Sequence, residues 1–576
     1  MQYVKRSLLF NTLPLSLGVN FMLALLSCIA PCPTKAQIIP DGTLGDKNSI
    51  VVPDDIVNGK PPTDRIYGGA IQGSNLFHSF KEFNVDKGAE AYFINPGGIT
   101  NILTRVTGGN PSNILGSLGV LGPANLFLIN PKGIVFGPNA RLDMGGSFVA
   151  STADSLVFDN GFEFSATNPQ APLLTVNIPV GLRFRDASGK IINRSKATVD
   201  GISIGLQIPP QKTLALIGGN VDLEGGWLLG SDVQIEIASV ADSSLVNFIN
   251  SDTGYKFDYS GVENFQDILL SDQAIVNINT NGSGSIRMQG RNVTLNGESR
   301  LFINNSGSQY GGGVLIQAEQ LTLDNASISA DVRGLGQGGN VTIETQDLLV
   351  QNGARIYTTT FGGGNGSTVK INATDSVVME GESQSQQGFF SGVQSVVAGG
   401  ASGDAGGVEI NTASFLLKDG ARLDTTTFGG GDGGKVTIKA TDSTVIQGES
   451  QQGLFSGVLS LAAGGASGNA GEVEINTASF LLKDGARLDT TTFGDGKGGT
   501  VKINATDSVV MEGESRRQER LSGIESVVGG GASGDAGGIE INTASFLLKD
   551  GARLDTTTFG GGDGGKVTIK ATDSTV

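Results

Sequence analysis

Few residues of this chain have the types and spacing that catalysis or ligand binding needs. Residues 429–435 read Gly-Gly-Gly-Asp-Gly-Gly-Lys, close to a phosphate-binding loop, but Val436 stands where that loop needs a Ser or Thr to hold magnesium. The segment also precedes a predicted strand rather than a helix, and it recurs at residues 560–566. We therefore interpret it as a turn between repeating units and expect no nucleotide binding.

Carboxylates in glycine-rich turns are the candidates for calcium binding. Asp432, Asp495 and Asp563 lie in such turns, but each is solitary, whereas calcium-binding β-rolls repeat the Asp so that successive turns share an ion. His78 is the only histidine, so neither a multi-histidine zinc site nor a His-based triad with a spare base can be built. We expect neither a metal nor a cofactor.

The elements that carry these residues are repeats. A block that begins at Ser414 recurs nearly unchanged at Ser479 and Ser545. The phenylalanines that close these blocks, together with a weaker first copy, follow one another in steps of 67, 65 and 66 residues and are Phe361, Phe428, Phe493 and Phe559. Apolar strand starts between Val369 and Val567 alternate between long steps of 37–39 residues and short steps of 28. Each repeat therefore holds two coils of a repetitive fold.

One short coil reads as three strands. Apolar and polar residues alternate over residues 408–413, 414–418 and 421–428, with breaks at Asp419-Gly420 and at the glycine run after Phe428. No stretch of the repeats reads as a helix. This pattern predicts an all-β fold, a right-handed parallel β-helix that is a single-stranded solenoid with about three strands per coil. We expect about twenty coils and a rod on the order of 100 Å long.

Parallel β-helices include polysaccharide-cleaving enzymes, which use clustered carboxylates or a basic residue in a groove. Asp419, Arg422 and Asp424 recur together in the repeats. By strand alternation, Arg422 and Asp424 point outward, and a solvated ladder of opposite charges accounts for them. We expect no catalytic residues and predict that the chain is not an enzyme.

Charge and cysteine content limit the partners and the compartment. The formal net charge is −17, which argues against nucleic acid as a partner. Cys28 and Cys32 are the only cysteines, and both lie in the N-terminal leader. A mature chain without disulfides suits export in an unfolded form, although a repeat rod also needs no covalent staples.

Residues 1–36 read as a secretory signal peptide. Lys5 and Arg6 precede an apolar stretch that is strongest at residues 21–30, and Thr34 and Ala36 are the small residues that a signal peptidase reads. We predict cleavage before Gln37. A permanent membrane helix and a lipid anchor are the weaker alternatives.

Two Asn-Pro motifs follow short apolar strands near the N-terminus. In such a motif Pro fixes one dihedral angle, Gly accepts positive φ, and the Asn side chain bonds the backbone ahead, so each motif predicts a tight turn at a strand end. The motif residues are Asn95, Pro96, Gly97 and Gly98, and then Asn130, Pro131, Lys132 and Gly133.

These motifs and their surroundings resemble the N-terminal secretion domain of the filamentous haemagglutinin family. The resemblance runs from about Gln37 to Ser151 and is densest over residues 67–85, both motifs, 113–125 and 147–151; residues 191–224 are again similar. Gly97 and Lys132 replace the Asn that is typical at the third motif position. The family comprises large exoproteins of the two-partner secretion pathway. The resemblance implies that the periplasmic domains of an outer-membrane transporter recognise this domain, and that the motifs serve that recognition or act as structural turns.

We predict a domain order from these signals. It comprises a signal peptide at 1–36, a two-partner secretion domain at 37–165, a continuation of the β-helix with a Pro-rich excursion at 166–240, degenerate coils at 241–348, and near-identical repeats of about 66 residues at 349–576. Because the last repeat stops in the middle of a coil, we expect a fragment of a longer protein or an interrupted reading frame.

The resemblance implies an adhesin that is secreted or attached to the surface of a double-membrane bacterium, reached through the periplasm and outer membrane. Its partners would be a host or neighbouring-cell glycan or protein, held by multivalent weak contacts along the repeats. The sequence shows no aromatic groove that would identify the ligand. The alternatives are the N-terminal fragment of a contact-dependent toxin carrier and an extracellular polysaccharide-acting β-helix protein.

Overall fold

A computed structural model describes residues 38–55, 63–169, 178–186, 188–251, 254–384 and 389–576. The predicted signal peptide lies outside these residues. Among them, no helix has the length and apolar character needed to cross a membrane, and the helical element is one short 3-10 turn, η1 (Gly45–Lys47). The remaining elements are strands.

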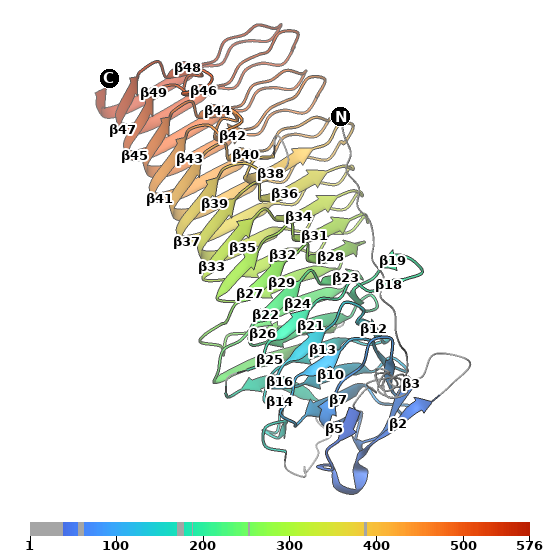
Figure 1. The fold of residues 1–576 in the computed structure, drawn as a ribbon. Helices are drawn as coiled ribbons and strands as arrows, with labels where there is room; N and C mark the ends of the chain where they lie inside the picture. The colour runs from blue at the N-terminus through green and yellow to red at the C-terminus, as the bar shows by residue number, and fades with distance from the viewer. Residues whose placement is uncertain (1–37, 56–62, 170–177, 187, 252–253, 385–388) are drawn as a thin grey trace, which may run out of the picture.

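The strands wind into a parallel β-helix with three faces, which confirms the predicted fold class (Figure 1). Sixteen strands stack in parallel on the first face: β5 (Asn75–Phe83), β7 (Asn101–Val106), β10 (Asn125–Ile129), β13 (Phe148–Ser151), β21 (Thr213–Gly218), β24 (Gln234–Ser239), β29 (Ser285–Gln289), β32 (Val314–Gln317), and the first halves of β35 (Val341–Gln351), β37 (Val369–Glu380), β39 (Val408–Lys418), β41 (Val436–Gln447), β43 (Val473–Lys483), β45 (Val501–Glu512), β47 (Ile539–Lys549) and β49 (Val567–Thr575).

The second face continues from the first around a bend. It comprises β8 (Ser112–Ile114), β11 (Ile134–Phe136), β17 (Ile191–Asn193), β22 (Val221–Glu224), β27 (Ile268–Ser271), β30 (Asn292–Leu295), β33 (Gln320–Asp324) and then the second halves of the long strands from β35 onward.

The third face closes each coil. It comprises β3 (Thr63–Gly68), β6 (Glu90–Phe93), β9 (Ser117–Val120), β12 (Arg141–Asp143), β20 (Leu206–Gln207), β23 (Trp227–Ser231), β28 (Ile275–Thr280), β31 (Arg300–Asn305), β34 (Ser327–Val332), β36 (Arg355–Thr360), β38 (Gly392–Val397), β40 (Arg422–Asp424), β42 (Gly457–Leu459), β44 (Arg487–Asp489), β46 (Gly523–Glu525) and β48 (Arg553–Asp555).

The coils of the repeats differ in detail from the prediction. Residues 408–413 and 414–418 form one bent strand, β39, whose pairing register shifts between Thr412 and Ser414. The third predicted strand is present as β40, followed by an isolated bridge at Thr427. The described residues form sixteen coils, or about 70 Å of stacking, rather than twenty, because part of the chain runs outside the helix.

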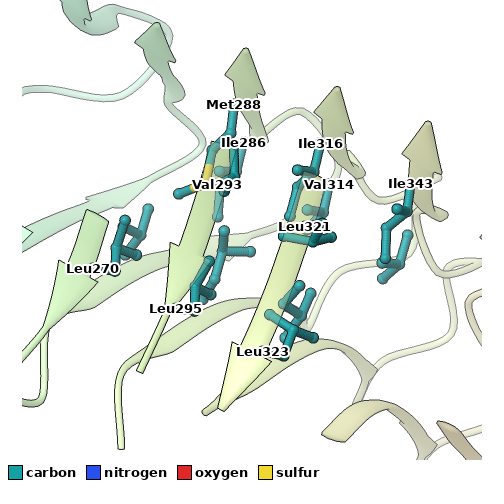
Figure 2. Packing of buried hydrophobic residues seen from close by; sticks show 14 of the residues in the cluster. Leu270, Ile286, Met288, Val293, Leu295, Val314, Ile316, Leu321, Leu323 and Ile343 are labelled. Atoms are coloured by element: carbon teal, nitrogen blue, oxygen red, sulfur yellow. The ribbon is translucent and has the colours of Figure 1, made fainter. Parts of the chain in front are cut away.

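Columns of aliphatic side chains fill the interior. Met288, Ile316 and Ile343 occupy the same register position on successive first-face strands, and Leu270, Leu295 and Leu323 do so on the second face (Figure 2). All six are buried. Burying each such side chain contributes roughly 1.5–3 kcal/mol, and parallel stacking repeats that contribution once per coil.

Antiparallel strands close the N-terminal end and cover one side of the rod. β1 (Ile38–Pro40) and β4 (Ala70–Gln72) pair antiparallel with β5, and β2 (Ser49–Asp55) pairs antiparallel with β3. Outside the helix lie the hairpin β18 (Thr198–Val199) and β19 (Ile202–Ser203), and a five-stranded sheet of β14 (Ser155–Phe158), β15 (Glu163–Ser165), β16 (Pro179–Phe184), β25 (Ser244–Ser251) and β26 (Gly254–Asp258).

The five-stranded sheet makes a second hydrophobic core with the outer side of the first face. Phe127 of β10 lies against Phe248 and Tyr255 at ring-centroid distances of 5.8 and 5.2 Å. Double-sided burial explains why residues 126–129 are apolar without alternation. The chain leaves the helix at Ser155, earlier than its Pro-rich segment indicated, and leaves it a second time at Ser244, which no sequence signal marked.

A buried carboxyl group ties this sheet to the rod. Tyr259 donates a hydrogen bond to Glu236 of β24 over 2.7 Å, and the Arg287 guanidinium lies 5.0 Å from the Tyr259 ring centroid. Burial raises the pKa of Glu236 to about 7, although Arg287 and the Tyr259 hydroxyl act to lower it. The folded chain therefore keeps this carboxyl protonated at pH values where the unfolded chain has lost the proton.

This shift predicts a pH-dependent stability. Since the folded pKa lies above the unfolded value of 4.5, the free energy of unfolding falls as the pH rises from 4.5 to about 7, by up to about 3 kcal/mol from this group. Glu236→Gln removes that contribution. Urea unfolding, followed by the fluorescence of Trp227, the only tryptophan, should give a flatter pH profile for the variant; an unchanged slope would contradict the assignment.

Candidate functional site

The first Asn-Pro motif is an exposed turn between the third and first faces. It follows β6 and leads into β7, with Pro96, Gly97 and Gly98 exposed. Gly98 has φ +86°, and a side chain built at Gly97 or Gly98 would meet no atom within 4 Å. Asn95 donates a hydrogen bond from Nδ2 to the Pro96 carbonyl over 3.3 Å, while its Oδ1 is covered and has no hydrogen-bond partner among the described residues.

The second motif is a buried corner between the first and second faces. The Asn130 side chain is buried; its Nδ2 donates to the Asn110 carbonyl and to Ser112 Oγ over 3.1 and 3.0 Å, and its Oδ1 accepts the Lys132 amide over 2.9 Å. The Gly133 amide donates to the Asn130 carbonyl over 3.0 Å and completes the turn. The predicted turn chemistry is therefore present in full.

Backbone from a later coil packs against this second turn. The Gly189 amide donates to the Pro131 carbonyl over 2.9 Å. Gly133 has φ +123°, and a Cβ at this position would lie 3.0 Å from the Lys190 carbonyl oxygen. Only the Lys132 side chain of this motif is exposed.

The structure does not bring the two motifs into one patch. The first precedes β7 and the second follows β10, and β7 and β10 are paired neighbours on the first face. The motifs therefore lie at opposite ends of that face, separated by the length of a five-residue strand, roughly 17 Å. Their similar sequences occupy different environments.

Three asparagines line up next to the first motif, and two of them, Asn75 and Asn101, are buried. Asn101 donates to Asn75 over 3.1 Å, and Asn125 donates to Asn101 over 3.0 Å, so the amides form a ladder at the start of three paired strands. Tyr255 of the outer sheet donates to Asn101 over 3.0 Å. This ladder holds the register of the first coils next to the exposed turn.

His78 is part of the hydrophobic framework. It is fully buried between aromatic rings, 5.9 Å from the Phe80 centroid and 5.1 Å from that of Phe93, with Nδ1 2.9 Å from Ser49 Oγ. Burial lowers its pKa to about 3. The imidazole is therefore neutral at physiological pH and inaccessible to a substrate.

Arg105 of β7 is a key residue that no sequence motif marked. It is fully buried, and its guanidinium donates to Thr43 Oγ1, to Ser79 Oγ and to the Ser165 carbonyl over 2.7–2.8 Å. It also lies 4.3 Å from the Phe164 ring centroid. Burial lowers its pKa to about 10, which nearby Asp41 opposes, so the group stays charged at neutral pH.

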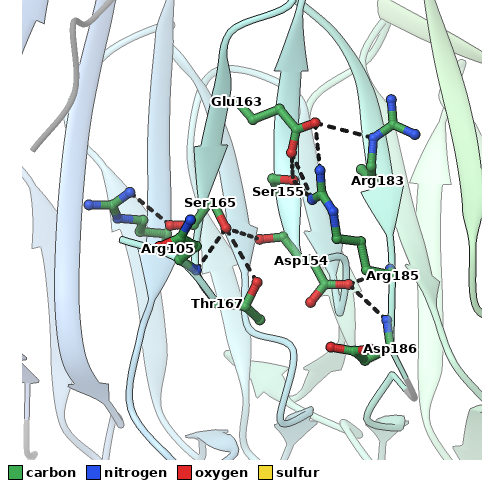
Figure 3. A network of polar contacts seen from close by, with 10 residues as sticks. Arg105, Asp154, Ser155, Glu163, Ser165, Thr167, Arg183, Arg185 and Asp186 are labelled. Carbon is green, nitrogen blue, oxygen red and sulfur yellow. Dashed lines mark hydrogen bonds and ion pairs between the residues drawn. The ribbon is translucent and has the colours of Figure 1, made fainter. Parts of the chain in front are cut away.

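The three hydrogen bonds of Arg105 join the N-terminal cap, the first coil and the outer sheet. Figure 3 shows the bond to Ser165 of the outer sheet. The network continues within that sheet, where Arg185 donates to both carboxylate oxygens of Glu163 over 2.8 and 2.9 Å. Burial acts to raise the pKa of Glu163, but the hydrogen bonds from Arg185 and Ser155 outweigh it and lower the pKa. Arg105, a charged residue inside strand β7, thus joins the N-terminal cap, the first coil and the outer sheet.

The other candidate residues lie in the repeats. Asp432 lies at an exposed corner, where its carboxylate accepts the Asn469 amide over 2.8 Å. In the described part of the chain, no group of three or more His, Cys, Asp or Glu side chains is placed to hold a metal ion. The glycine-rich segment 429–435 connects the third face to β41, as a coil-to-coil turn does.

Arg422 differs from its predicted environment. Instead of forming a solvated ladder with acidic residues, its guanidinium lies 4.3 Å from the Phe455 ring centroid, and its Nε donates to the Phe455 carbonyl over 3.1 Å. Burial lowers the pKa of Arg422, with Asp424 opposing the shift. The cause is the extra loop of the long coil at residues 448–457, which folds over the strand.

Arg105 gives a test of this framework. Arg105→Ala removes three charge-assisted hydrogen bonds and is expected to lower the free energy of unfolding by about 3 kcal/mol or more. Urea unfolding monitored at Trp227 measures it. The matched control is Arg291→Ala, which removes a half-exposed ion pair with Asp267 and should cost less than about 1 kcal/mol. Equal losses for the two variants would contradict the role of Arg105.

The family model of the TPS secretion domain matches residues 36–288. No curated protein sequence matches the chain. Among solved structures, the HMW1 secretion domain from Haemophilus influenzae is 13% identical, with 93% of this chain and 100% of that chain covered at a TM-score of 0.33. The filamentous hemagglutinin secretion domain is 16% identical, with 58% and 99% covered at a TM-score of 0.26. Residues 36–288 of this chain therefore form a TPS secretion domain, the export module of two-partner secretion.

Proposed function

We propose that this chain is a two-partner exoprotein whose first Asn-Pro turn is recognised by the periplasmic domains of its outer-membrane transporter, and whose rod acts outside the cell as a non-enzymatic adhesin. Exoproteins with a TPS secretion domain leave the cell through such transporters. The recognition turn, the surface location and adhesion are the steps we add.

The exposed turn at Asn95 carries the proposal. Pro96, Gly97 and Gly98 present backbone with open space around them, and the covered Asn95 Oδ1 lacks a donor among the described residues. A fold that needed this turn only for its own stability would be expected to satisfy that oxygen, as it does at Asn130. Because the oxygen is covered, a partner that docks on the exposed backbone of Pro96, Gly97 and Gly98 supplies this hydrogen bond only after the turn shifts to uncover it.

The second motif serves folding rather than contact. Every polar group of the Asn130 side chain is used within the domain, and the turn is covered by residues 189–190. In the folded domain this corner is closed to a partner. We therefore assign recognition to the first motif and coil geometry to the second.

The rod provides a direction for export. Each new coil pairs with the preceding one on the first two faces and, except between β12 and β20, on the third face, so coils that fold outside the cell stabilise the next coil to emerge. Folding in this order disfavours return of the chain. The same repetition presents identical surfaces to a glycan or protein on a host or neighbouring cell, where many weak contacts add up.

Single substitutions separate recognition from folding. In cells that express a two-partner transporter, Asn95→Ala should lower the protease-accessible fraction on intact cells and in the medium several-fold, while urea unfolding of the purified chain stays within about 0.5 kcal/mol of wild type. Asn130→Ala should lower the free energy of unfolding by about 2–3 kcal/mol, because it leaves buried partners unpaired.

Lys132→Ala is the matched control within the second motif, since its side chain is exposed; it should retain both export and stability. Unaltered export of Asn95→Ala would refute recognition at the first turn. Exposure of the wild-type chain without any transporter would refute the two-partner route itself.

A further inference from the structure

A row of exposed phenylalanines runs along one corner of the rod. Phe361, Phe428, Phe493 and Phe559 each follow the end of the third face and are 44, 51, 49 and 71% exposed. Large exposed apolar side chains cost solubility, so a regular series of them requires an explanation other than core packing.

The pairing register places these rings in one line. Isolated bridges link Val397 to Thr427, Thr427 to Ala462 and Ala462 to Thr492, and the pattern continues through Val528 to Thr558. The residues that come directly after these positions are therefore aligned, and they alternate between a phenylalanine and a small residue: Phe361, Ala398, Phe428, Ala463, Phe493, Gly529, Phe559. One ring thus occurs every second coil, which is about 10 Å along the rod.

The small residues make room for the rings. A Cβ at Gly529 would lie 2.4 Å from Cδ1 of Phe493. The Phe493 ring therefore packs against the backbone of the neighbouring coil instead of pointing straight into solvent. At the N-terminal end, the Arg333 guanidinium lies 4.4 Å from the Phe361 ring centroid. The four exposed rings of Phe361, Phe428, Phe493 and Phe559 therefore recur at an even spacing, and we call this series the phenylalanine ladder.

Polar and acidic groups lie beside the ladder. Exposed Asp432 and Asp495 are in the turns that follow Phe428 and Phe493, and the carboxylate of Asp432 accepts an amide of the next coil, so the turns are ordered. Carboxylates accept hydrogen bonds from hydroxyl groups and repel anions. The lysines of the same turns are paired, Lys435 with Glu472 and Glu474 and Lys497 with Asp535, so they leave no unpaired positive charge for an anion. This arrangement favours a neutral, hydroxyl-rich partner over sulfated or other anionic polysaccharides.

We propose that the phenylalanine ladder binds an extended, neutral β-1,4-linked polysaccharide, with one sugar of each disaccharide stacked on one ring. In such a ribbon the sugar face alternates along the chain, so equivalent C–H faces recur once per disaccharide, the same interval of about 10 Å that separates the rings. Apolar sugar faces pack on the π-face of an aromatic ring. This names a ligand class for the proposed adhesin and rests on that function.

Binding of the purified full chain to microcrystalline cellulose and to chitin tests the ladder, measured as depletion from solution. Wild type should bind at least one of the two. Phe428→Ala with Phe493→Ala should weaken retention about tenfold, because adjacent platforms act together on one glycan chain. Replacement of both by Tyr should keep binding, whereas replacement by Leu, which is apolar without a ring face, should lose it.

Ile202→Ala, a still more exposed apolar residue (69%) on the distant β18–β19 hairpin, is the matched control and should bind like wild type. No binding by wild type, or full binding by the Ala or Leu pair, would overturn the proposal; full binding by the Leu pair would indicate a non-specific apolar contact. The purified chain bypasses export, so a protein that is exported without binding either glycan refutes the ladder alone, and one that binds but stays periplasmic refutes the export proposal alone.

Discussion

Stacking of one coil on the next is the interaction on which the rest of this molecule depends. A single coil has only a few residues on each face and cannot enclose a core, whereas consecutive coils share backbone hydrogen bonds on three faces and continue the same aliphatic columns, such as Leu270, Leu295 and Leu323. Because the contribution is repeated at every step, the rod tolerates insertions at its corners. The long loops, the outer sheet and the β18–β19 hairpin are all placed there.

The first coil has no predecessor, and the N-terminal region solves that problem with antiparallel strands and buried polar contacts. β1, β2 and β4 cover the open end, and Arg105 fastens this cap to the first coil and to the outer sheet. Burying a guanidinium is costly unless its donors are satisfied, so this arrangement fixes one geometry rather than adding much stability. A start with one defined geometry gives the next coil a fixed template on which to stack.

The two Asn-Pro turns show how one sequence pattern can occupy two different environments. At Asn130 the amide is satisfied by the coil around it, and at Asn95 the same residue type leaves an acceptor unsatisfied beside open backbone. The difference arises because residues 189–190 of a later coil cover the second turn. In the repeats, one position of each coil alternates between a phenylalanine and a small residue, and this alternation places the rings in a line with a defined spacing.

The sequence by itself determined the local and periodic features. Two-residue alternation, Asp-Gly turns and steps of 28 and 37–39 residues specify strands, corners and coils, because these depend on neighbours in the chain and on repetition. The Asn-Pro motifs and their setting likewise identified the secretion domain. Only the tertiary structure decided which of the two motifs is exposed and that Arg105 joins three elements. It also decided that Arg422 stacks on a phenylalanine under a loop instead of pairing with acidic residues. Finally, it placed phenylalanines that are 65–67 residues apart in one row. Those features depend on contacts between residues distant in sequence, and on the cost of burying charge, neither of which a periodic pattern encodes.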